Sequence, residues 1–222
     1  MIPLRDVIPS RTTPYVTVSI IILNAAAWFF ELSIPGDALP SFLQTYGVVP
    51  AQFQVPTLFT SMFLHGSWSH VIGNMWYLWI FGDNVEDRLG HGRFIVFYLM
   101  CGTVAALGQI AIEPSSTLPT IGASGAIAGV MGAYFVLYPR SRVLTLIPLI
   151  VFWEIVELPA IILLGFWFVM QLVSAGAISV TAAAHGSGGV AFAAHVAGFV
   201  VGMIGVFVFR KRREDSWDAN YY

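Results

Sequence analysis

The chain has 222 residues, of which 57% are apolar and only 10% are charged, with a mean hydropathy of +0.78. Soluble domains usually carry about 25% charged residues, so this composition cannot build a water-exposed surface, and most of the chain is expected to face lipid or itself. The net charge of −2 gives no sign of nucleic acid as a partner, and the single cysteine, Cys101, excludes an intrachain disulfide and a cysteine cluster for zinc.

Six apolar stretches follow one another along the chain. A helix that crosses the hydrocarbon core needs about 20 mostly apolar residues. On this basis the predicted spans are residues 15–34, 68–82, 94–112, 124–138, 158–177 and 189–209. The second and fourth spans are short, which favours helices that are shielded from lipid by their neighbours. We therefore expect one all-α integral membrane domain, residues 15–209, built as a bundle of six transmembrane helices.

The segments outside these spans are short. Residues 1–14 hold three prolines and no small-residue cleavage site, so we expect a retained cytoplasmic N-terminal segment and not a cleaved signal. Residues 143–157 are apolar but are interrupted by Pro148, Glu154 and Glu157, and we expect a membrane-surface or re-entrant segment there. Residues 210–222 are expected to form a basic and polar cytoplasmic tail.

Positive charge gives an independent test of this topology. The ten lysine and arginine residues fall only at the N-terminus, between spans two and three, between spans four and five, and in residues 210–213. The three loops on the opposite side contain none. Because basic residues stay on the cytoplasmic side of a membrane, six spans with both termini in the cytoplasm satisfy every one of them. A chain with five or seven spans would place the last basic cluster outside.

Strongly polar side chains are few inside the spans, and such residues usually mark a functional site because they are costly in lipid. They are Asn24, His70, Asn74, Gln109, Ser124, Gln171 and His195. Spans two, four and six all run from outside to inside, which places His70, Asn74, Ser124 and His195 at a similar depth in the outer half. Taken singly, each could be a packing residue or an interhelical hydrogen-bonding group. Their convergence at one depth favours a site.

Ser124 opens the fourth span between Gly122 and Gly125. The free N–H groups at a helix start stabilise developing negative charge, and the glycines leave room for a peptide. A serine hydroxyl becomes a good nucleophile when an adjacent base takes its proton, and His195 is the histidine placed to supply that base. The sequence therefore indicates a serine hydrolase site inside the membrane.

Further residues complete this hypothesis. His70 and Asn74 are four apart and so share one helix face, from which they could donate hydrogen bonds to an oxyanion. Gly198 and Gly202 form a stripe of small residues that permits close contact between the sixth span and a neighbouring helix. Such contact would bring His195 within reach of the serine. Spans two, four and six carry no aspartate or glutamate at this depth, so we expect a Ser–His dyad without a carboxylate to orient the imidazole.

Four ordered motifs resemble the rhomboid family of intramembrane serine proteases. They are His65-x4-His70-x3-Asn74, Glu86-Asp87-Arg88-Leu89-Gly90, Gly122-Ala123-Ser124-Gly125, and Ala194-His195-Val196-Ala197-Gly198 followed by Gly202. Their spacing is similar to that of the family, and they cover most of the chain. The resemblance implies a six-helix core around a water-filled cavity that opens to the outside, with no cofactor and no metal. It implies single-span membrane proteins as substrates, cut near the outer membrane surface.

The same resemblance assigns roles to the residues of these motifs. It makes Ser124 the nucleophile, His195 the general base, and His70 with Asn74 the oxyanion hole. The residues that it assigns to structural motifs are Glu86, Arg88, Gly122, Gly125, Gly198 and Gly202, of which the first two form a network at the inner end of span two. We expect a multi-pass protein of a prokaryotic inner membrane whose site opens to the outside.

Two places depart from the family pattern. Pro56 and Thr57 stand where many members carry a Trp-Arg pair in the first loop. Ala128 stands one turn after the serine, where some members have an aromatic residue that packs on the catalytic imidazole. Another side chain must therefore fix the ring of His195. Neither departure removes a group that the reaction requires.

Other classes of protein fit the sequence less well. A non-catalytic rhomboid-like protein that binds or escorts membrane proteins would typically lack the serine or the histidine, and both are present. A small transporter would show an internal repeat or paired broken helices, and the sequence has neither. Cleavage by a metal or by paired aspartates lacks its reagents in the sequence. Of the remaining histidines, His65 is expected to structure a loop, His91 to be solvated and His185 to have no role.

Overall fold

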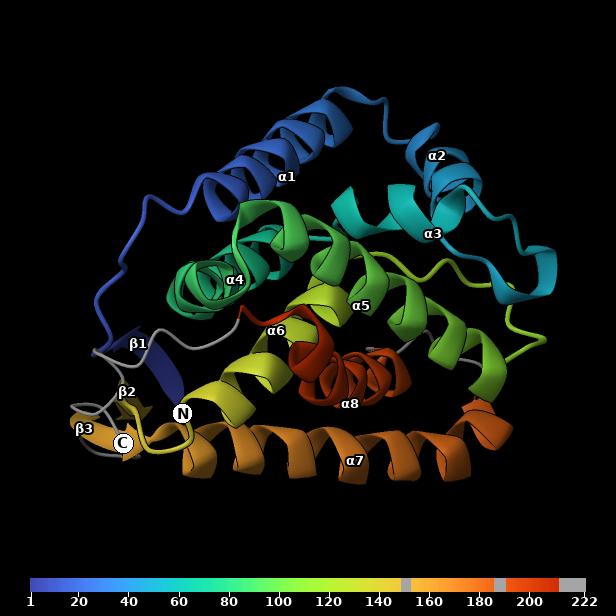
Figure 1. Cartoon of the computed structure of the whole chain (residues 1–222). Coiled ribbons are helices and arrows are strands. Elements are labelled where there is room, and N and C mark those ends of the chain that lie inside the picture. The colour runs from blue at the N-terminus through green and yellow to red at the C-terminus, as the bar shows by residue number, and fades with distance from the viewer. Residues whose placement is uncertain (149–152, 186–190, 212–222) are drawn as a thin grey trace.

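The computed structural model describes residues 1–148, 153–185 and 191–211, and it describes side chains there except in 176–185. The chain folds mainly into helices that pack as a bundle, with a small sheet at its edge (Figure 1). The long helices are α1 (Tyr15–Ser33), α4 (Trp68–Leu89), α5 (His91–Ile112), α6 (Ser124–Leu137), α7 (Ala160–His185) and α8 (Phe192–Phe209).

One of these helices lies over each of the six predicted spans. By length and composition, α1, α5 and α8 can each cross a membrane, while α6 and residues 160–175 of α7 are shorter apolar helices. Residues 149–152 of the predicted surface segment, 189–190 of the predicted sixth span and 212–222 of the predicted tail lie outside the described residues.

Helix α4 begins where the second span was predicted to begin but is longer than predicted. The Ser67 hydroxyl accepts a hydrogen bond from the N–H of His70 (3.2 Å) and caps the helix start. The helix continues past Gly82 to Leu89 and stops at Gly90, whose φ of 84° favours glycine. The helix is therefore longer than the predicted second span, because its charged last turns bind the N-terminal segment, as described below.

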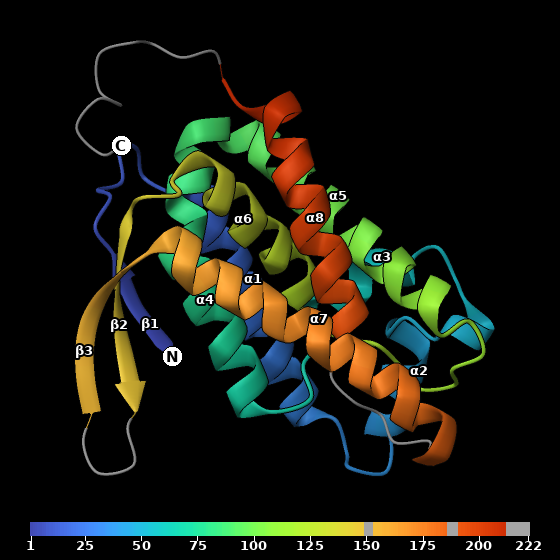
Figure 2. The same ribbon diagram turned by 90° about the horizontal axis from the view of Figure 1, so that it is seen from below.

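Helix α6 lies at the centre of the bundle. It lies among α4, α5, α7 and α8 and contacts all four (Figures 1 and 2). Most of its side chains are buried. Because its residues are mostly glycine, alanine and other small apolar types, neighbouring helices approach it closely. The prediction that the short fourth span is shielded by its neighbours is confirmed. Ser124, the predicted nucleophile, is the first residue of this central helix.

The long loop between α1 and α4 is folded. It forms α2 (Leu39–Tyr46), the 3-10 turn η1 (Pro50–Gln52), α3 (Thr57–Thr60) and a second turn, η2 (Ser61–Phe63). Two backbone hydrogen bonds between Val48 and Thr120 (3.0 and 2.8 Å) join it to the loop between α5 and α6. Leu58 is buried, and the Thr57 hydroxyl donates to the carbonyl of Gln54 (2.6 Å). The loop is therefore anchored without the Trp-Arg pair.

Three strands form an antiparallel sheet at the edge of the bundle (Figure 2). They are β1 (Ile2–Asp6), β2 (Arg142–Pro148) and β3 (Trp153–Pro159), in the order β1-β2-β3. Alternate residues of β2, Val143 and Thr145, are fully buried. The expectation of an all-α chain is wrong here, because the predicted surface segment contributes two strands and the N-terminus supplies the third. Near-continuous apolar residues hide the alternation that would have indicated strands.

Asp6, the last residue of β1, is a titratable residue whose side chain contacts α6. The hydroxyl of Tyr134 donates a hydrogen bond to its Oδ2 atom (2.7 Å). Burial raises the pKa of Asp6 from 3.8 to about 7; the hydrogen bond from Tyr134 lowers it, and the neighbouring charge of Asp83 raises it. At a pH between these two pKa values, the Asp6 carboxyl therefore keeps its proton in the folded chain and loses it in the unfolded chain.

This proton makes the stability of the folded chain depend on pH. We expect the stability to fall as the pH rises from about 4 to about 7, because the folded state binds more protons there than the unfolded state. Asp6→Asn should remove this part of the dependence and raise the melting temperature above that of the wild type at neutral pH. The check is the thermal midpoint in detergent as a function of pH, with the exposed Asp37 replaced by asparagine as the control. Identical pH profiles for the wild type and Asp6→Asn would contradict the prediction.

Candidate functional site

Ser124 and His195 lie in contact although they are 71 residues apart in the sequence. The Nε2 atom of His195 is 2.8 Å from the Oγ atom of Ser124. The serine is the first residue of α6, and the histidine lies in the first turn of α8 and is only 8% exposed. The two helix starts therefore place a hydroxyl and an imidazole within hydrogen-bond distance inside the bundle.

Glycines at the crossing of α6 and α8 make this contact possible. A Cβ atom on Gly198 would lie 2.1 Å from the carbonyl oxygen of Gly125, and one on Gly202 would lie 2.0 Å from that of Gly129. Real Cβ atoms essentially never come within 3.0 Å of such an atom. The two backbones thus touch directly at both positions, as the stripe of small residues predicted.

Two polar side chains of α4 face the backbone of Gly122, two residues before Ser124. The φ angle of Gly122 is 120°, and a Cβ atom there would lie 2.7 Å from His70 Nε2 and 3.6 Å from Asn74 Nδ2. The N–H of Gly66 donates to His70 Nδ1 (3.4 Å), so a neutral His70 carries its hydrogen on Nε2. Both nitrogens can therefore donate hydrogen bonds into the space beside Ser124.

His65 fixes the orientation of the Asn74 amide. Its Nδ1 atom lies 3.3 Å from the carbonyl oxygen of Phe63, which can only accept, so Nδ1 carries the hydrogen and Nε2 accepts from Asn74 Nδ2 (3.0 Å). The backbone N–H of His65 in turn donates to the buried carboxylate of Glu31 (3.1 Å). This agrees with the structural role predicted for His65. The role of Glu31 was not predicted, although a glutamate at the end of an apolar span is unusual enough to have indicated one.

Gln171 and Trp167 on α7 hold the imidazole of His195. The Oε1 atom of Gln171 lies 2.8 Å from His195 Nδ1. One helical turn earlier, the Trp167 ring lies 5.9 Å from the imidazole at an interplanar angle of 36°. The ring centroid of Phe192 lies 6.3 Å from that of His195. Gln171, Trp167 and Phe192 therefore contact the imidazole, to which Ala128 offers no aromatic contact. Gln171 was noted as a polar residue of the fifth span, but the sequence did not show what it contacts.

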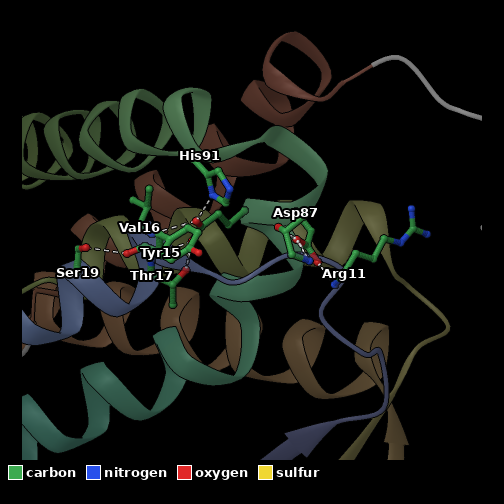
Figure 3. Close-up of polar contacts among 9 residues, drawn as sticks. Arg11, Tyr15, Val16, Thr17, Ser19, Asp87 and His91 are labelled. Carbon is green, nitrogen blue, oxygen red and sulfur yellow. Dashed lines mark hydrogen bonds and ion pairs between the residues drawn. The ribbon is translucent and has the colours of Figure 1, made fainter.

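The carboxylate of Glu86 joins the C-terminal end of α4 to α1 and α5. It is fully buried and accepts hydrogen bonds from the N–H groups of Val16 (3.0 Å) and Thr17 (2.7 Å), the Thr17 hydroxyl (2.7 Å) and His91 Nδ1 (2.5 Å). Because the first N–H groups of a helix lack partners within it, Glu86 caps α1. Figure 3 shows Val16, Thr17 and His91 gathered at this helix start. The side chain of His91 is 43% exposed, so it is partly solvated as predicted, but its contact with Glu86 was not predicted.

The neighbouring residues of this motif bind two other segments. The carboxylate of Asp87 accepts from the backbone N–H groups of Arg11 (2.6 Å) and Thr12 (3.0 Å), a contact also seen in Figure 3 for Arg11. The backbone carbonyl of Arg88 accepts from the N–H of Lys211 (3.1 Å). The C-terminal end of α4 thus contacts both the N-terminal segment and Lys211, which follows α8.

The site therefore offers a hydroxyl paired with an imidazole and two hydrogen-bond donors beside them. Within the described ranges, no group of three or more His, Cys, Asp and Glu residues is placed to hold a metal ion. His185 ends α7, and its side chain lies outside the described part of the structure. This geometry is suited to acyl transfer through a serine.

The fold and the site together define a class of protein. It is a membrane-type helical bundle in which a serine and a histidine are paired across two closely packed helices. A family model for the rhomboid domain matches residues 52–212, which is well over half of the chain. The chain therefore belongs to the rhomboid family and is an integral membrane protein.

Relatives with known names come from more than one cell compartment. YdcA, a rhomboid of Bacillus subtilis (strain 168), is 32% identical over 56% of this chain and 62% of its own length. The chloroplastic Rhomboid-like protein 11 of Arabidopsis thaliana is 28% identical over 89% of this chain and 69% of its own length. The rhomboid protease GluP of Bacillus subtilis (strain 168) is 34% identical over 47% of this chain and 21% of its own length. The chain thus spans less than two thirds of YdcA and about a fifth of GluP, and family membership does not fix the compartment.

Proposed function

We propose that this chain is an intramembrane serine endopeptidase that cleaves the transmembrane segments of single-span membrane proteins. Ser124 is the nucleophile and His195 the general base. The observation that carries the proposal is the 2.8 Å separation between Ser124 Oγ and His195 Nε2. Membership of a family in which a relative is named as a rhomboid protease supports it. The chemistry needs no cofactor.

The reaction proceeds in two halves. In the first, His195 Nε2 takes the hydroxyl proton while Ser124 Oγ attacks the scissile carbonyl carbon, and the negative charge moves to the carbonyl oxygen. The intermediate collapses, the C–N bond breaks, and the imidazolium gives its proton to the departing amine. In the second half, water gives a proton to His195 and attacks the acyl ester. The ester C–O bond then breaks, and the serine regains its hydrogen.

The oxyanion that forms in each half needs hydrogen-bond donors. His70 Nε2 and Asn74 Nδ2, which flank the backbone of Gly122, supply two, and the backbone N–H of Ser124 supplies a third. All these groups are fixed before the substrate arrives, so little reorganisation is required during the reaction.

Substrate selection follows from the limited space. A helical substrate hides its carbonyl groups in intrachain hydrogen bonds and must partly unwind before it can be cut. The backbones of α6 and α8 touch at Gly125 and Gly198, next to Ser124, so the packed helices cannot easily move apart for a bulky side chain. Small residues and helix breakers at the cleavage position are therefore preferred.

The site lies toward one end of the bundle. His70, Ser124 and His195 all stand in the first turns of their helices. With six spans and both termini in the cytoplasm, as the basic residues favour, these helix starts face the outside of the membrane. We place the protein in a prokaryotic inner membrane with its site open to the outside and to water.

The test is cleavage by the purified protein in liposomes with a tagged single-span substrate. The wild type should cut it and react with a fluorophosphonate probe, whereas Ser124→Ala and His195→Ala should lose cleavage, and Ser124→Ala should also lose labelling. Cleavage that persists in Ser124→Ala would refute the assignment. Substrate capture by the wild type without any cleavage would instead favour a non-catalytic protein that binds or escorts membrane proteins.

A further inference from the structure

The imidazole of His195 has two nitrogens, and a base that acts through one of them must be fixed through the other. To accept the serine proton at Nε2, a neutral histidine must carry its own hydrogen on Nδ1. The wrong tautomer would present an N–H group to the hydroxyl, and a ring turned by half a rotation would present the Cε1–H group, so neither could accept the proton. In serine hydrolases this task falls to a third side chain, and loss of the correct tautomer there costs about 10⁴-fold in rate.

The structure supplies a side chain for this task from a third helix. Gln171 Oε1 lies 2.8 Å from His195 Nδ1. A carbonyl oxygen can only accept, so Nδ1 must donate, and the lone pair of Nε2 then faces Ser124 Oγ at 2.8 Å. We propose that Gln171 is a positioning residue that completes a Ser124–His195–Gln171 triad, an inference that rests on the proposed function.

A glutamine suits this position better than the carboxylate of a soluble triad. The contact is partly buried within a bundle of apolar helices, and an ionised carboxylate in such surroundings carries a high desolvation cost. A neutral amide provides the same acceptor oxygen at a much lower cost. This agrees with the lack of an aspartate or glutamate at this depth in spans two, four and six.

A second contact on the same face of α7 supports the role. Trp167 lies four residues before Gln171, so the two side chains project from one face of the helix. The indole lies 5.9 Å from the imidazole and 5.9 Å from the ring of Phe199 one turn further along α8. The tilted contact with the indole limits rotation of the imidazole about its side-chain bonds, and the amide selects its tautomer. Together they fix the orientation of the imidazole, which an aromatic residue at position 128 would do in the family pattern.

The experiment compares two substitutions at position 171. Gln171→Met keeps a similar length but has no strong acceptor, whereas Gln171→Glu keeps an acceptor oxygen in either charge state. Met170, exposed on the same helix, gives the control Met170→Leu. Each protein is measured for the rate of fluorophosphonate labelling, for kcat and KM with a tagged single-span substrate, and for its melting temperature.

Gln171→Met should label and cleave about 10-fold to 100-fold more slowly, with an unchanged KM and melting temperature. Gln171→Glu should recover part of the rate, and Met170→Leu should match the wild type. Wild-type rates in Gln171→Met would overturn the proposal. So would equal slowing of both variants together with a lower melting temperature, because that marks a purely structural role.

Labelling separates this proposal from the function on which it rests. If the wild type is labelled at Ser124 but cuts no substrate, the protease assignment fails, and the ratio of labelling rates still decides whether Gln171 positions the histidine. If the wild type is neither labelled nor active, both proposals are wrong.

Discussion

Replacing Gly198 by alanine is expected to slow cleavage by about a hundredfold and to lower the melting temperature. The new Cβ atom would lie 2.1 Å from the carbonyl oxygen of Gly125, a backbone atom that cannot rotate away. Helices α6 and α8 must then separate by about 1 Å, and such overpacking typically costs about 1–3 kcal/mol. The separation also draws His195 away from Ser124, and a misplacement of about 1 Å can cost about a hundredfold in rate.

Gly165→Ala on α7 is the matched control. A Cβ atom there would make an ordinary contact, 3.7 Å from an atom of the Phe135 ring. Because glycine inside a helix costs about 0.5–1 kcal/mol relative to alanine, this variant should be as stable as the wild type or more stable. The measurements are the cleavage rate and the thermal midpoint in detergent. A Gly198→Ala variant that keeps both at wild-type values would show that the close contact of α6 with α8 is not needed.

The spacing of polar residues in an apolar chain predicted much of this site. Ser124 and His195 were placed at one depth from helix direction alone, and the glycine stripe predicted how their helices approach. Both arguments use local periodicity and the fixed thickness of a bilayer, which leave few alternatives for six apolar stretches. The structure brings these residues together, with His70 and Asn74 beside them.

Long-range pairing is what the sequence could not predict. Strand β1 pairs with β2 from the far part of the chain, and the alternation of burial at the start of β2 is masked in the sequence by a run of apolar residues. Gln171 was visible as a polar residue in a span, but its rotation about the α7 axis relative to His195 depends on tertiary packing. The extension of α4 was missed because its last turns carry charge, whose partner, the start of α1, lies far away in the sequence.

Asn74→Leu is expected to slow cleavage by about 10²-fold to 10³-fold with little change in KM, which is the typical cost of losing one oxyanion-hole donor. One hydrogen of the Asn74 amide is taken by His65 Nε2 (3.0 Å), and the other remains for the oxyanion. Leucine has a similar volume and no donor, so the fold should be kept while the transition state loses a hydrogen bond. The effect falls on kcat because the charge exists only after the serine has attacked.

A second buried asparagine provides the control for this experiment. Asn24 is fully buried on α1, and its Nδ2 atom donates to the carbonyl of Ile20 on the same helix (2.8 Å). Asn24→Leu removes a buried amide of the same kind at a distance from Ser124, so the cleavage rate should stay near that of the wild type. If Asn24→Leu slows the reaction as much as Asn74→Leu, the loss reflects helix packing and not the oxyanion. If Asn74→Leu raises KM and leaves kcat unchanged, Asn74 binds the substrate before attack instead of stabilising the charge that attack creates.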